Sequence, residues 1–148
     1  MDKNVLIHVK GIQLADQKDE EAPIELVVPG EYYFRNGSHF LKYEEMVEDY
    51  SGSTVSYVKI SEKSVEVRKK GLINVHMVFE PGKKNLTYYA TPFGTVQMGI
   101  AATHIHVDQE EKALTVNVEY ALDMSEGVVA ECYLTIHADE KNSASFQL

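Results

Sequence analysis

A hydrophobic period of two constrains this chain more than any other feature of its sequence. Apolar residues occupy alternate positions at Val5, Ile7 and Val9, and the same alternation returns across 73–79. Side chains of a strand point to opposite faces in turn, whereas an amphipathic helix repeats about every 3.6 residues. No window of the sequence carries a helical repeat longer than about a turn or two. The pattern therefore predicts a chain built from β-strands.

Turn residues separate the alternating segments and join them as hairpins. Asn36-Gly37 is the strongest of these signals, because both residues tolerate the positive φ angles of a type I′ turn. Pro29-Gly30 predicts a bend, Pro81-Gly82 a turn, and Pro92-Phe93-Gly94 a break or bulge in strand hydrogen bonding. The strands expected between these points are 5–9 with a continuation to 14, 24–28, 31–35, 39–47, 54–61, 64–70, 72–79, 86–91, 96–107, 113–122 and 129–138.

With 24–28 and 31–35 joined through the bend at Pro29-Gly30, these segments predict an all-β chain of roughly eight to ten antiparallel strands in a meander. A meander of that many twisted strands rarely stays open, because closure removes its exposed edges. We therefore expect a small barrel, and a two-sheet sandwich is the alternative. A barrel of this size is either filled by side chains or holds one small ligand. Since the sequence contains no repeat or linker, residues 1–148 are expected to form a single β-barrel domain.

The charge balance disfavours one class of partner. The chain carries 23 acidic and 14 basic side chains, for a net charge of −9, which repels phosphate backbones. The two basic runs, Arg68-Lys69-Lys70 and Lys83-Lys84, lie beside predicted turns and are interpreted as solvated strand ends. We therefore expect no nucleic-acid partner.

The expected compartment is the cytoplasm. Cys132 is the one cysteine, so no disulfide can form within the chain, which favours a reducing environment. The first residues have no signal-peptide character, and no stretch approaches the roughly 20 apolar residues of a spanning helix. We accordingly expect no membrane partner. Nothing in the sequence indicates an oligomeric state.

Several motifs of the chain match a known family. They are Gly30-Glu31-Tyr32-Tyr33, Tyr43-Glu44-Glu45, the run from Met77 to Gly82, Tyr88-Tyr89, the run from Thr91 to Thr95, and Met98-Gly99-Ile100. On these residues nearly the whole chain resembles the YwiB-like family of small bacterial proteins of unknown function. The resemblance implies a calycin (lipocalin-like) β-barrel and a bacterial source. The chain has no tryptophan, so the Gly-x-Trp motif of lipocalins is absent and their ligand chemistry is not carried over.

One polar constellation is a candidate ligand site. Tyr43 and Glu45 share a face of one expected strand, Tyr57 and Lys59 share a face of the next, and Arg68 lies on the third. If these faces point into the barrel, the charges must be paired, and the network could recognise an anionic ligand beneath the tyrosine hydroxyls. The alternative is a set of cross-strand ion pairs outside the barrel.

His104 and His106 are candidate metal ligands. The motif His-x-His places two imidazoles on one strand face, with His137 or His76 as a third ligand from another strand. The alternative is a solvated face near a strand end. No cofactor is expected.

No catalytic residue is predicted. Cys132 shares a face with Ala130, Leu134 and Ile136, and such an apolar setting makes a thiol inert. The serines form no Gly-x-Ser-x-Gly elbow. Three functions stay open. They are a non-enzymatic binder of a small anionic or amphipathic ligand in the lumen, a filled barrel that serves as a scaffold or protein-interaction module, and an enzyme that uses the lumen. The calycin resemblance favours the first.

Overall fold

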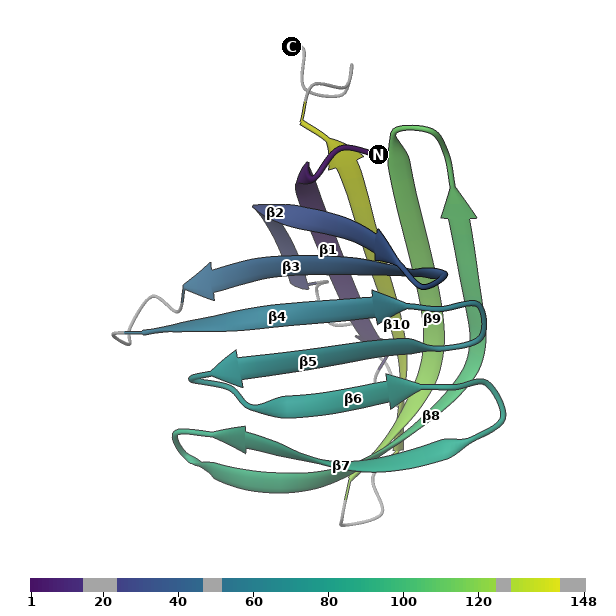
Figure 1. Ribbon diagram of the computed structural model, residues 1–148. Helices are drawn as coiled ribbons and strands as arrows, with labels where there is room; N and C mark the ends of the chain where they lie inside the picture. Colours follow the sequence, from purple (N-terminus) through teal and green to yellow (C-terminus); the bar gives the residue numbers. More distant parts are fainter. Residues whose placement is uncertain (15–23, 47–51, 125–128, 142–148) are drawn as a thin grey trace.

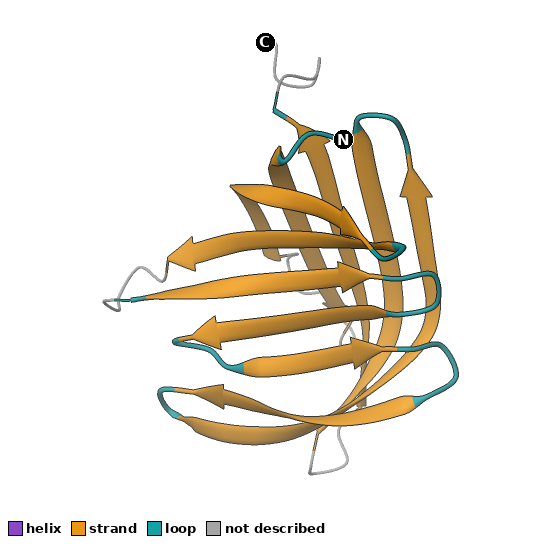
Figure 2. Cartoon of the chain, viewed as in Figure 1, coloured by secondary structure: helices purple, strands orange, loops and turns teal. Residues whose placement is uncertain are grey.

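The chain is all β in the part that the computed structural model describes, which is residues 1–14, 24–46, 52–124 and 129–141. Every regular element there is a strand (Figure 2). A search of these residues finds no helix with the length and apolar character needed to cross a membrane. The strands are β1 (Asn4–Leu14), β2 (Ile24–Arg35), β3 (Ser38–Met46), β4 (Ser53–Ile60), β5 (Val65–Gly71), β6 (Val75–Phe79), β7 (Lys84–Thr91), β8 (Gly94–Gln109), β9 (Ala113–Met124) and β10 (Val129–Glu140).

All ten strands belong to one antiparallel sheet in the order β6-β5-β4-β3-β2-β1-β10-β9-β8-β7. Strands that follow one another in sequence are paired, except β6 and β7, and the first strand also pairs with the last. Ile7 of β1, for example, lies opposite Ala138 of β10. The sheet curls into a nearly closed barrel (Figure 1). The expected antiparallel meander that closes into a calycin-like barrel is confirmed.

The turn signals behave as the sequence predicts. Asn36 and Gly37 have φ angles of 53° and 79°, both in the left-handed region, and they join β2 to β3 as a tight hairpin. Pro92 and Phe93 form the turn between β7 and β8, where Thr91 lies opposite Gly94. The predicted break in strand hydrogen bonding is thus a hairpin turn rather than a bulge.

Two strands bend to turn the corners of the barrel. β2 pairs with β1 through residues 24–31 and with β3 through residues 30–35, so it changes partner at Gly30. β8 pairs with β7 through residues 94–101 and with β9 through residues 98–109, with a shift of register between Ala102 and His104. Because of these bends, β3 to β7 run across the direction of β1, β9 and β10 (Figure 1). Pro29-Gly30 therefore marks a corner within one strand.

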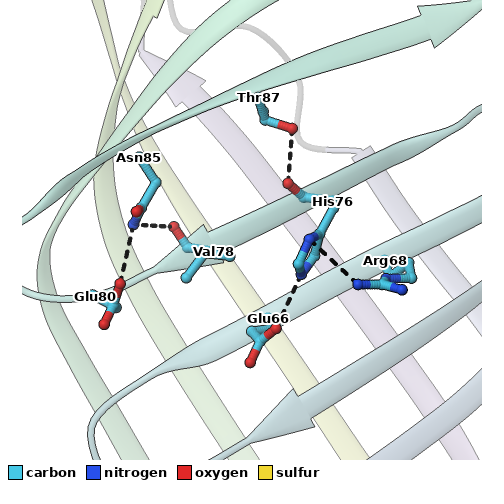
Figure 3. Close-up of polar contacts among 7 residues, drawn as sticks. All are labelled: Glu66, Arg68, His76, Val78, Glu80, Asn85 and Thr87. Atoms are coloured by element: carbon cyan, nitrogen blue, oxygen red, sulfur yellow. Dashed lines mark hydrogen bonds and ion pairs between the residues drawn. The ribbon is translucent and has the colours of Figure 1, made fainter.

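The barrel closes between β6 and β7 along a seam with few main-chain bonds. A single bridge joins the main chains of Asn74 and Ala90, with two N–H···O distances of 2.9 Å. Side chains make the other contacts, as Figure 3 shows: the Thr87 hydroxyl donates to the His76 carbonyl at 2.8 Å, and the Asn85 amide donates to a β6 carbonyl at 3.1 Å. These side chains satisfy main-chain acceptors that a regular ladder would otherwise pair.

Apolar side chains fill the middle of the lumen. Ile60, Phe79, Ile100 and Leu114 are almost wholly buried, and each contributes roughly 1.5–3 kcal/mol relative to exposure. The ring of Phe79 on β6 meets that of Tyr120 on β9 with 4.9 Å between ring centroids. These strands are not neighbours in the sheet, so the contact spans the lumen. A small barrel is either filled by side chains or holds a small ligand; the middle of this barrel is filled by its own side chains.

Gly30 is expected to be indispensable at its corner. A Cβ atom there would lie 2.6 Å from the carbonyl oxygen of Lys42 and would also overlap the side chain of Ile7. We predict that Gly30→Ala lowers the free energy of unfolding by about 1–3 kcal/mol in a denaturant titration, as overpacked substitutions do. Gly11→Ala is the matched control, because nothing lies within 4 Å of a Cβ atom at that position. Equal stability of the two variants would contradict this account of the corner.

Candidate functional site

The inner faces of β3, β4 and β5 become polar toward the end of the barrel where β3 ends and β4 begins. Directly opposite residues of an antiparallel pair share a face. Tyr43 lies opposite Ser56, and Ser56 lies opposite Lys69. One step further out, Glu45 lies opposite Thr54. Polar side chains from three adjacent strands are thereby gathered on the inner wall.

The Lys69 ammonium group is held at the centre of this gathering. Its Nζ donates to both Glu45 carboxylate oxygens at 3.2 Å and to the Ser56 hydroxyl at 3.1 Å. It also lies 5.8 Å from the centroid of the Tyr43 ring, within cation–π range. Ser56 is wholly buried and Tyr43 is 4% exposed, whereas the side chains of Lys69 and Glu45 keep 20% and 24% of their surface exposed. The pair is shielded from solvent without being sealed from it.

Two phenols complete what we call the Lys69 cluster: Tyr43, Glu45, Ser56, Lys69 and Tyr89. Burial raises the pKa of Tyr43 to about 12, the Glu45 carboxylate adds to that rise, and a hydrogen bond with Ser56 offsets part of it. Burial also raises the pKa of Tyr89, again with a contribution from Glu45. Both hydroxyls are therefore neutral at physiological pH and can donate or accept a hydrogen bond.

An ion pair inside an apolar barrel requires an explanation. Two charges lose hydration when they are buried, and their mutual attraction often does no more than offset that cost. An apolar pair of similar volume would serve stability as well. Among the described residues, Lys69 and Glu45 form the ion pair that lies on the inner wall; the pairs made by Lys83 and Lys84 involve exposed side chains. The cluster is therefore the candidate functional site.

The structure separates the five residues that the sequence grouped as a ligand site. Tyr43 and Glu45 lie on the inner wall, but Tyr57, Lys59 and Arg68 lie on the outer face and are exposed. Figure 3 shows Arg68 beside His76, at 3.5 Å, on that outer face. The condition for a buried network of Glu45, Lys59 and Arg68, that all three faces point into the barrel, is met by Glu45 alone. Ligand binding by the five residues stays a prediction. The pairing register brings Ser56, and not Tyr57, opposite Tyr43. The inward-facing residues of β4 and β5 are therefore one position away from Tyr57 and Arg68, which the sequence interpretation grouped with Tyr43.

Sequence interpretation misses Lys69, because it treats Arg68-Lys69-Lys70 as one solvated run of basic residues. The run lies within β5, where consecutive side chains alternate: Arg68 and Lys70 are exposed and Lys69 is half-buried. The sequence does contain a pattern that indicates an inward-facing Lys69. Val65 and Val67 are buried at the alternate positions that precede Lys69.

His104 and His106 lie on the outer face of β8. The His104 side chain is 75% exposed and its Nδ1 lies 3.9 Å from a Glu119 oxygen. The proposed third ligands bind elsewhere: His137 contacts Asp139 at 2.8 Å and His76 contacts Glu66 at 3.0 Å. The described residues contain no group of three His, Cys, Asp or Glu side chains that could hold a metal ion. The metal site stays a prediction.

Cys132 lies in the core, as the sequence predicts. It is 5% exposed, and burial raises the pKa of its thiol, which disfavours the reactive thiolate. Burial also raises the pKa of its neighbour Tyr120 far above the usual value. Both groups are uncharged members of the lumen wall.

The fold and the site define a class: a ten-stranded antiparallel barrel with an apolar middle and an ion pair on its inner wall toward one end. The chain belongs to the family described as Domain of unknown function (DUF1934), whose model matches residues 7–136. It is similar to the uncharacterized beta-barrel protein YwiB of Bacillus subtilis (strain 168), with 25% identity over 122 residues that cover 82% of this chain and 83% of the relative. The crystal structure of the ywiB protein from Bacillus subtilis matches 93% of this chain and 92% of its own, with a TM-score of 0.76 and 25% identity. These matches confirm the expected family, whose function is unknown.

The Lys69–Glu45 pair should be coupled energetically. Lys69→Met leaves the Glu45 carboxylate without its cation, and we predict a loss of about 1–3 kcal/mol in the free energy of unfolding. In a double-mutant cycle with Glu45→Gln, the double variant should lose less than the sum of the two single variants. Lys70→Met, the exposed neighbour, should change stability by less than about 0.5 kcal/mol. If Lys70→Met were as damaging as Lys69→Met, the assignment of faces would be wrong.

The buried Tyr43 phenol predicts alkaline sensitivity. Its pKa in the folded protein, about 12, lies above the ordinary value of 10.0, so the unfolded chain loses this proton first as pH rises. The stability that the neutral Tyr43 phenol gives the folded state is therefore complete below pH 10 and is lost between pH 10 and about 12. We predict that Tyr43→Phe removes one tyrosine from the late-ionising fraction in an ultraviolet absorbance titration. Tyr88→Phe, a change at an exposed ring, should leave that fraction intact; a late fraction unchanged in Tyr43→Phe would refute the assignment.

Proposed function

We propose that this barrel is a non-enzymatic binder of a small polar molecule, which it holds at the Lys69 cluster. The observation that supports this proposal is the Lys69–Glu45 ion pair on an inner wall whose middle is apolar. Because a buried pair adds little net stability, recognition of a ligand accounts for it better than folding does.

The cluster has hydrogen-bonding capacity beyond its internal contacts. The three N–H donors of Lys69 are directed to the two Glu45 oxygens and the Ser56 hydroxyl. A carboxylate offers about four lone-pair sites, of which Lys69 uses part, so the spare capacity lies with Glu45 and the phenols. A suitable ligand therefore carries an amine or hydroxyl donor for Glu45 and an anionic group that replaces one of the two Glu45 oxygens at Lys69. Amino acids and small hydroxy acids have this chemistry.

The ligand is proposed to lie at the mouth of the barrel and not in its middle. Side chains such as Phe79, Ile60 and Ile100 occupy the middle. Lys69 and Glu45 keep about a fifth to a quarter of their side-chain surface exposed, which leaves a path for a solute. Binding there needs no opening of the apolar core.

A filled barrel that serves as a protein-interaction module is the second candidate function. The packed middle favours it, and so do the apolar side chains of the β7–β8 hairpin that face solvent: Leu86 is 65% exposed, Tyr88 63% and Phe93 82%. For such a module the outer surface, and not the lumen, carries the activity, and no small polar molecule stabilises the protein.

Thermal unfolding with a panel of amino acids, hydroxy acids and inorganic phosphate tests the proposal. A ligand at about 100 times its Kd stabilises the folded state by about 2.7 kcal/mol. For a chain of this size that corresponds to a rise in Tm of roughly 5–10 °C. We predict such a rise with one class of the panel.

Variants locate the site. Lys69→Met should abolish the rise, Ser56→Ala should reduce it while keeping the ion pair, and Lys70→Met should leave it unchanged. A rise that persists in Lys69→Met, or no rise with any compound of the panel, would reject the proposal; the second outcome favours the interaction module.

A further inference from the structure

The outer face of β2, β3 and β4 contains a groove on the other side of the sheet from the Lys69 cluster. It encloses about 250 Å³. Leu41 lines it together with aromatic and cationic residues: Tyr33, Arg35, Phe40, Lys42 and Tyr57. We call it the outer groove. Because β-strand side chains alternate, none of its ring or cationic residues belongs to the inner wall.

Aromatic and cationic side chains are close neighbours on this face. Tyr33 lies opposite Phe40, and Lys42 lies opposite Tyr57. The Nζ atom of Lys42 is 5.7 Å from the Tyr57 ring centroid, and that of Lys59 is 5.9 Å from the Phe40 ring centroid. Each lysine thus lies beside a ring face, and its charge has no carboxylate within ion-pair distance among the described residues.

The groove is locally positive on an acidic protein. The whole chain carries a net charge of −9. At the groove, Arg35 and Lys42 line the wall and Lys59 lies on the next strand. Glu31, opposite Lys42, accepts a hydrogen bond from the Tyr33 hydroxyl at 2.6 Å, which is the main cause of its lowered pKa, and Glu66 lies opposite Lys59. Among the described residues that line the groove itself, two are cations and none is a carboxylate, which favours an anion at this place.

The geometry points to a binding site for a small aromatic anion in the outer groove, which we propose is a mononucleotide. Its base stacks on the exposed Tyr57 ring, and its phosphate contacts Arg35 and Lys42. An aromatic face binds a flat base, and guanidinium and ammonium groups bind phosphate, so the two parts of the ligand match the two kinds of lining residue. A groove of about 250 Å³ is small among ligand sites, so one nucleotide fills it and stays partly exposed.

Calorimetric titration with adenosine monophosphate tests this inference, with adenosine and inorganic phosphate as the two halves of the ligand. We expect the monophosphate to bind more tightly than either half and to weaken as salt rises. Tyr57→Ala should weaken it by about fivefold to a hundredfold, the range for one stacked base. Arg35→Gln should weaken it by roughly tenfold or more, the range for a hydrogen bond to a charged group.

Matched controls keep the result specific. Tyr88→Ala removes an exposed tyrosine of β7, and Lys70→Met removes an exposed cation of β5; both should leave the affinity unchanged. Lys69→Met should also leave it unchanged, so the outer groove can fail or succeed independently of the Lys69 cluster.

Three outcomes would overturn the inference. They are no heat of binding for adenosine monophosphate, an affinity unaffected by Arg35→Gln and Tyr57→Ala in variants with native circular dichroism, and a short single-stranded oligonucleotide that binds far more tightly than the mononucleotide. The last outcome would replace the small-molecule occupant with a nucleic acid.

Discussion

The interaction on which this structure depends is the contact of apolar side chains from opposite walls across the lumen. A single meandering sheet without helices has no second layer to cover its apolar face, so it buries that face by curling onto itself. Phe79 of β6 and Tyr120 of β9 meet inside, although β7 and β8 separate them around the wall. The corners at Gly30 and in β8 serve this contact, since they let the sheet curl onto itself.

Once the middle is filled, chemistry is left to the ends and to the outside. Two strands, β3 and β4, contribute to two different arrangements on their two faces. Inside, one lysine is held by a carboxylate, a hydroxyl and a ring. Outside, lysines lie beside aromatic rings with no carboxylate in ion-pair distance among the described residues. The first arrangement is charge-balanced and largely desolvated, and the second is positive and open. Two kinds of side-chain chemistry are thus separated by the thickness of one sheet.

The sequence predicted the architecture well and the site in part, for physical reasons. Turn dipeptides such as Asn36-Gly37 impose backbone angles locally, so the hairpins could be placed without tertiary information. The family motifs then supported the barrel. Face assignment in β4 failed because its inner wall reads Thr54, Ser56, Val58, Ile60: half of it is polar, so the apolar alternation that marks a buried face is weak there. Which residues of β3 and β4 share a face depends on pairing register, which the sequence does not state.

The pairing of β1 with β10 has a consequence for how the protein is made. Ile7 and Ala138 lie opposite each other on paired strands although nearly the whole chain lies between them. While the chain emerges from the ribosome, hairpins of consecutive strands can form early, but the edge of β1 stays unpaired until the last strand is available. Closure is therefore a late event of high contact order, and such topologies fold slowly. During synthesis the exposed first strand is the part of the nascent chain with most need of protection from aggregation.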